Sequence, residues 1–215
     1  MNVFQELIQS AISSGVSEQT VVLLLLLPLV ASVVAAARHL LGFRGFGILI
    51  PTAIALVFVI VGVWTGILVF VAILLMATIA RFILRRLHLQ YLPRMALLLW
   101  LVSLGVLGII FISPQFGQEK LMTISIFPIL ILILLAEDFI GVQIGKSLRE
   151  ATRLTLETIL IALMGYFIFN LQWLKDLALY FPHWVVLAPL VLNLLVGRYT
   201  GLRLLEYHRF RKLLK

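Results

Sequence analysis

The 215-residue chain is 63% hydrophobic and 12% charged, with a mean hydropathy of +1.17 and a net charge of +8. This composition excludes a water-soluble globular protein, and several apolar runs are as long as a membrane span. Cysteine is absent from the sequence, which excludes disulfides, thiol catalysis and thiolate metal sites. Because lipid offers the backbone no hydrogen bonds and the apolar runs are continuous, the spans are predicted to be helices rather than barrel strands.

The predicted fold is an all-α membrane protein with seven transmembrane helices. In chain order, the expected spans are residues 21–37, 46–63, 66–83, 95–112, 121–136, 156–169 and 184–197. A short outer segment at residues 1–20 precedes this seven-helix domain, which we place at residues 21–200. A basic cytoplasmic tail is expected at residues 201–215.

The basic residues predict the orientation of these spans. All seventeen lysines and arginines except Lys120 and Lys175 fall on one side of the seven-span arrangement. The positive-inside rule makes that side the cytoplasm, so the N-terminus is expected outside and the C-terminus inside. The positive charge is then explained by the orientation of the protein and by contact with anionic membrane lipids. We expect no nucleic acid partner.

The second expected span begins with residues that weaken helices. The stretch at residues 40–55, LLGFRGFGILIPTAIA, contains three glycines, a proline and an arginine: Gly42, Gly45, Gly47, Pro51 and Arg44. Pro128 lies in a comparable position in the fifth span, which crosses in the opposite direction. This arrangement is what an inverted repeat predicts, in which the second and fifth spans are broken helices around a central site. Two ordinary proline kinks, which membrane helices tolerate, are the alternative.

Motifs for catalysis are missing from the sequence. It contains no HExxH, its four histidines lie near the predicted membrane ends without paired ligand spacing, and Asp138 and Asp176 are its only aspartates. Ser103 has no histidine at a plausible depth to activate it. The sequence therefore predicts a protein that is not an enzyme and that holds neither a metal nor a cofactor.

Several segments resemble the seven-helix membrane module that is usually fused, in bacteria, to an inactive transglutaminase-like domain. They are LLGFRGFGILIPTAIAL, LPRMALLL, SIFPILIL with AEDF, and LLVGRYTGLRLLEYHRF. The resemblance runs from about residue 30 to 211, and its most specific part is the Gly-Arg-Tyr-Thr-Gly run at residues 197–201. Residues 24–112 also resemble the small membrane subunit of capsular poly-gamma-glutamate synthesis, which has a similar broken span.

This family is associated with ATP-grasp ligases and an aspartic-peptidase-like protein. The resemblance therefore implies a non-enzymatic subunit of the bacterial cytoplasmic (inner) membrane. Such a subunit would dock a cytoplasmic ATP-grasp-type amide ligase, and would anchor it or conduct its peptide- or polyglutamate-like product. A separate outer-domain protein and a second copy of this chain stay open as further partners. The alternative is a seven-helix structural or signalling anchor without transport.

Under the leading hypothesis, the broken helices around Gly42, Gly45, Gly47, Pro51 and Pro128 expose backbone groups to a cavity. Arg44 and Arg94 are expected to bind carboxylates. Glu137 and Asp138 are expected at the inner mouth, where they pair with Arg198. That arginine opens the run that continues through Tyr199, Thr200 and Gly201. Simple solvation at the membrane interface is the alternative for these charged and aromatic residues.

Overall fold

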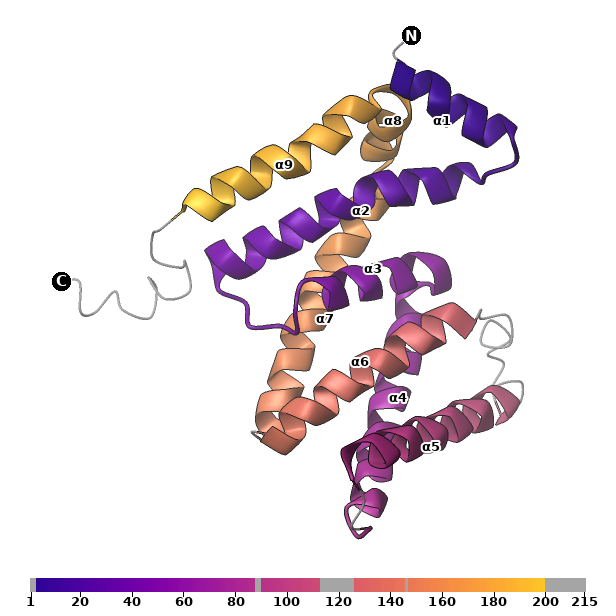
Figure 1. Cartoon of the computed structure of the whole chain (residues 1–215), viewed down its shortest axis with the longest axis vertical. Coiled ribbons are helices and arrows are strands. Elements are labelled where there is room, and N and C mark those ends of the chain that lie inside the picture. The colour runs from indigo at the N-terminus through magenta and orange to yellow at the C-terminus, as the bar shows by residue number, and fades with distance from the viewer. Residues whose placement is uncertain (1–2, 88–89, 113–125, 146, 200–215) are drawn as a thin grey trace, which may run out of the picture. The chain divides into compact units, whose positions relative to one another are not determined.

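The computed structural model describes residues 3–87, 90–112, 126–145 and 147–199, and these form helices without a strand (Figure 1). The predicted all-α class is thus confirmed for these ranges. The chain divides into two compact units, the first being Met1–Leu56 with Leu156–Lys215 and the second Val57–Thr155.

The helices of the first unit come from both ends of the chain. They are α1 (Val3–Ser13), α2 (Glu18–Ala36), the π-helix η1 (Ala37–Leu41), the start of α3 (Leu49–Val61), most of α7 (Leu148–Asn170), α8 (Gln172–Tyr180) and α9 (Pro182–Arg198). The second unit holds the rest of α3 and α7, with α4 (Val63–Leu84), α5 (Tyr91–Ile112) and α6 (Ile126–Gly145). Each of the seven expected apolar segments contains or overlaps a helix, whereas α1 and α8 were not predicted.

Helix length separates these seven apolar helices into two groups. Within the described ranges, five are long and apolar enough to cross a membrane: α2 with η1, α4, α5, α6 and α7. The α8–α9 pair, bent by 110°, makes a sixth if it counts as one span. Helix α3 has 13 residues, and at about 1.5 Å per residue it falls short of a hydrocarbon core of about 30 Å. The structure therefore supports five or six spans, and the expected seven are not established by length.

The two prolines singled out in the sequence occupy equivalent places in their helices. Pro51 is the third residue of α3, and Pro128 is the third residue of α6. In a first turn the missing proline N–H has no partner within the helix, so Pro51 does not interrupt α3. The expected break in the second span is present, but in front of α3, at residues 42–48. Helix α6 is unbroken from Ile126 to Gly145, but residues 113–125 before it lie outside the described ranges, so the expected break in the fifth span stays a prediction.

Helices α2 and α9 lie side by side in the first unit and run in the same direction (Figure 1). Two hydrogen bonds join them at matching levels. The Asn193 Nδ2 atom donates to the Ser32 hydroxyl at 2.8 Å, and farther along, the His39 ring contacts the carbonyl oxygen of Tyr199 at 3.0 Å. Both helices therefore bring their C-terminal ends to one end of this unit, together with their basic residues.

Helix α7 packs closely against α2 and α3 at Gly165. A Cβ atom added there would lie 2.9 Å from the Ala55 Cβ and 2.9 Å from the Val30 Cγ1 atom. Both neighbouring side chains are completely buried. Because neither a backbone-bound methyl nor a branched valine can move away freely, only glycine fits between these three helices.

We expect Gly165→Ala to destabilise the protein by about 1–3 kcal/mol through overpacking. The matched control is Gly108→Ala in α5, where an added Cβ would have no neighbour within 4 Å. That control should be neutral or stabilising by up to about 1 kcal/mol, because alanine favours a helix over glycine. Thermal unfolding in detergent, followed by circular dichroism, measures the difference. Equal midpoints for the two variants would contradict the close packing.

In the second unit, α4 packs against both α5 and α6. The centre of this unit contains fully buried side chains from two of these helices: Phe70 and Ile73 of α4, and Leu132 and Ile140 of α6. The opposite faces remain apolar, as Leu75 and Trp100 illustrate with 59% and 58% exposure. Apolar side chains on both the buried and the exposed faces are typical of helices that contact lipid.

Candidate functional site

The chain leaves helical geometry between α2 and α3. Helix α2 continues into the π-helix η1, which ends at Leu41 and is followed by Gly42 with a left-handed φ of 91°. Any other L-residue would be strained in this conformation by about 1–2 kcal/mol. The glycine cluster thus produces the predicted departure from the helix, and π-helical turns of this kind occur frequently at functional sites.

The segment after Gly42 is held against α7. The backbone N–H of Phe46 donates to the Thr158 Oγ1 atom at 2.9 Å, and the backbone N–H of Arg44 donates to the Glu157 carboxylate. Gly45 is buried beside them, where an added Cβ would approach the Thr158 Oγ1 atom to 2.9 Å. Two hydrogen bonds and one close approach therefore fix the position of this loop.

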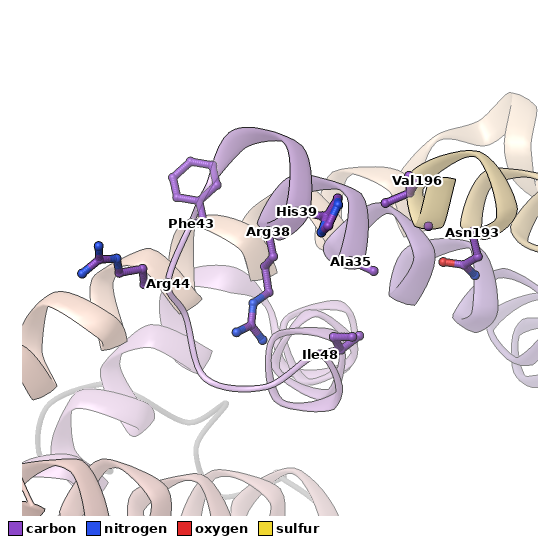
Figure 2. A pocket seen from close by; sticks show the side chains of 9 residues that line it. Ala35, Arg38, His39, Phe43, Arg44, Ile48, Asn193 and Val196 are labelled. Carbon is purple, nitrogen blue, oxygen red and sulfur yellow. The ribbon is translucent and has the colours of Figure 1, made fainter. Parts of the chain in front are cut away.

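The loop borders a pocket of about 570 Å³, which we call the arginine pocket (Figure 2). This volume lies in the range of small-molecule sites. Its lining residues come from α2, η1, the loop and α9: Ala35, Arg38, His39, Phe43, Arg44, Ile48, Asn193, Val196 and Gly197. Figure 2 shows the Arg38 side chain within the inner curve of the loop, whereas the Arg44 side chain extends outward from it. Arg38 is therefore the better placed of the two to contact a ligand.

His39 connects this pocket to the end of α9. Its Nε2 atom lies 3.0 Å from the carbonyl oxygen of Tyr199, and the two rings meet edge to face with centroids 6.4 Å apart. Since a carbonyl oxygen only accepts hydrogen bonds, the Nε2 atom is the donor. This contact holds the C-terminal ends of η1 and α9 together.

The chemistry of the lining residues suits the binding of an anion. Two arginines supply positive charge, and no lining residue carries a carboxylate, a hydroxyl or a thiol. An arginine guanidinium presents paired N–H groups that match a carboxylate or a phosphate. Over the described ranges, no three His, Asp or Glu side chains gather as a metal site would require. The pocket therefore suits an anionic ligand.

The structure gathers one part of the predicted site in the first unit. Gly42, Arg44, Gly45 and Gly47 form the loop, and Pro51 is buried just after it. Arg198 ends α9, Tyr199 follows it, and Thr200 and Gly201 lie outside the described residues. The remaining predicted residues belong to the second unit: Arg94 on α5, and Pro128, Glu137 and Asp138 on α6. The pairing of Glu137 or Asp138 with Arg198 would join the two units, and it stays a prediction.

Three polar lining residues were not predicted from the sequence: Arg38, His39 and Asn193. Arg38 and His39 directly precede the glycine cluster, where basic residues after a first span are expected in any case. Asn193 had the clearer signal, because a polar residue within an apolar span is by itself an indication of a partner or a site. Its actual neighbours depend on the packing of α9 on α2.

Comparison with known proteins gave one family match. A family model described as seven transmembrane helices usually fused to an inactive transglutaminase matches residues 3–214. Comparison with curated proteins and with solved structures gave no significant match.

Proposed function

The chain belongs to the family of seven-transmembrane-helix modules usually fused to an inactive transglutaminase, and on this premise we propose that it is a non-enzymatic membrane subunit. Its membrane domain would dock a cytoplasmic ATP-grasp-type amide ligase, and would anchor that ligase or conduct its product. The product we propose is a peptide rich in carboxylates, such as a glutamate oligomer. The family description supports the non-enzymatic role, because the fused domain is itself described as inactive.

The observation that carries this proposal is the arginine pocket. Arg38 and Arg44 place two positive charges beside a loop that is not helical, and the lining carries no negative charge. Backbone N–H groups released from a helix can face a polar substrate in a membrane protein. A carboxylate chain would bind the Arg38 guanidinium, with the positive charge of Arg44 beside it.

We test the conducting role with the purified chain in proteoliposomes loaded with a glutamate oligomer. Release of the oligomer above the rate from protein-free liposomes is expected, and a glutamine oligomer of equal length is the matched control because it lacks the carboxylates. Co-purification with a co-expressed ATP-grasp ligase tests the docking role. If the ligase co-purifies with the chain but no oligomer is released, the function is anchoring alone. If the ligase does not co-purify and no oligomer is released, the proposal is contradicted.

The proposed orientation has an N-terminus outside the cytoplasmic membrane and a C-terminus inside it. Because the natural sequence has no cysteine, single cysteines report the side of the membrane directly. Ser14→Cys, exposed after α1, should react with a membrane-impermeant maleimide in intact cells. Arg149→Cys, exposed near the start of α7, should react only after permeabilisation. The reverse pattern would contradict the orientation.

A structural or signalling anchor without transport is the second candidate. The contact of His39 with the Tyr199 carbonyl favours it, because basic side chains at helix C-termini bond the last carbonyls and interact favourably with the helix dipole. In that case Arg38 and Arg44 would stabilise helix ends and bind no ligand. Measured binding of the glutamate oligomer separates the two candidates.

A further inference from the structure

A second cationic pocket lies within the second unit, between α4 and α6. It has a volume of about 180 Å³ and is lined by Thr78, Arg81 and Phe82 of α4, by Arg85 directly after that helix, and by Gln143 of α6. We call it the Gln143 pocket. The two arginines are four residues apart at the C-terminal end of α4, so they lie on one face of the chain there and their positive charges repel each other. Arg94 of α5 is also close enough for its charge to act on Arg81.

Within its lining, the Gln143 pocket has no negative charge to balance these arginines. The repulsion between them would be relieved by a bound anion, and guanidinium groups bind phosphate oxygens well. Such an anion would have to reach the C-terminal end of α4, where Phe82 is 67% exposed. The pocket therefore has both a charge that attracts an anion and an open apolar side.

Gln143 supplies the second, independent observation. The residue is only 8% exposed, and its Oε1 atom is buried without a hydrogen-bond partner. Leaving a buried acceptor unpaired costs free energy, and most buried polar groups in folded proteins have a hydrogen-bond partner. The neighbouring Thr78 hydroxyl already donates to the Leu74 carbonyl at 2.8 Å, so its proton is not free for Gln143. A ligand that carries a hydrogen-bond donor would satisfy the Oε1 atom.

We propose that the Gln143 pocket binds a glycerol-phosphate group, with the phosphate on Arg81 and Arg85 and a hydroxyl donating to the Gln143 Oε1 atom. A phosphate alone would leave the Oε1 atom unpaired, and a neutral polyol would leave the arginines unbalanced. The exposed apolar residues beside the pocket, Ile79, Phe82 and Ile83, favour a lipid headgroup of the phosphatidylglycerol type as the source, with its acyl chains along α4. This inference is independent of the proposed function of the arginine pocket.

Native mass spectrometry of the purified chain tests the site with short-chain phosphatidylglycerol, phosphatidylcholine and soluble glycerol phosphate. Phosphatidylglycerol should be retained, and the double variant Arg81→Ala with Arg85→Ala should weaken its retention by about 10-fold or more. Arg86→Ala is the matched control, because Arg86 lies over the Phe82 ring at 6.0 Å and does not line the pocket. Equal retention by the double variant and the wild type would overturn the proposal.

Gln143→Leu separates the hydroxyl contact from the charge contact. It should reduce the preference for phosphatidylglycerol over phosphatidic acid, which lacks the headgroup glycerol, and it should leave phosphatidic acid binding unchanged. Its thermal midpoint without lipid should match or exceed that of the wild type, since the unpaired acceptor is removed. An unchanged lipid preference would overturn the role of Gln143. Binding of soluble glycerol phosphate as tight as that of the lipid would assign the site to a soluble source and overturn the lipid one.

Discussion

Replacing Arg38 with alanine is expected to weaken binding of a glutamate oligomer by about 10-fold to 150-fold, because a hydrogen bond to a charged group contributes about 1.5–3 kcal/mol. Arg38 is half-buried, and its side chain lies within the inner curve of the loop (Figure 2). Arg38→Lys should recover only part of the affinity, because lysine keeps the charge and loses the paired N–H geometry. Fluorescence anisotropy with a labelled oligomer and the chain in nanodiscs measures the dissociation constants.

Two other arginines serve as controls for this measurement. Arg44→Ala should have a smaller effect than Arg38→Ala, because the Arg44 side chain extends outward from the loop. Arg149→Ala should leave the affinity unchanged, since Arg149 is an exposed residue near the start of α7 that does not line the pocket. Equal losses for all three variants would indicate a general effect of charge. Unchanged affinity for Arg38→Ala would remove the arginine pocket from the proposed function.

Thr158→Val is expected to release the loop that forms the arginine pocket. Thr158 is completely buried and Phe46 is 7% exposed, so the substitution leaves the Phe46 N–H buried without its acceptor. A buried donor left unpaired in this way costs about 1–3 kcal/mol. The thermal midpoint should fall by roughly 2–4 °C for each kcal/mol lost. Tryptic cleavage after the exposed Arg44 should become faster, because the loop is then held less firmly.

Thr155→Val, one turn earlier on the same helix, is the matched control. Its hydroxyl is also buried, but it donates to the Ala151 carbonyl of its own helix at 2.9 Å. That carbonyl keeps the backbone hydrogen bond of the helix, so little is lost when the hydroxyl is removed. If the two variants unfold alike and are cleaved at Arg44 alike, the contact between the loop and α7 does not stabilise the pocket.

Local backbone chemistry made part of the site predictable. The glycines of residues 42–47 indicated a departure from the helix, and the φ of 91° at Gly42 is the conformation that explains a glycine there. The consequence of Pro51 was not predictable in the same way. A proline interrupts a helix in its interior and is tolerated in its first turn, so its effect depends on where the helix begins. The start of α3 follows a loop that Thr158, far away in the sequence, helps to hold in place.

The sequence by itself determined that the chain is an all-helical membrane protein, because apolar runs in lipid must satisfy their backbone hydrogen bonds internally. It also determined where the apolar helices lie, since hydropathy is a local property of each segment. Only the tertiary structure decided which polar groups meet. Ser32 and Asn193, separated by 161 positions, are joined by the parallel packing of α2 and α9, and the buried Gln143 Oε1 atom is left unpaired by the packing around it. Such pairings depend on contacts between distant segments, which no local pattern in the sequence records.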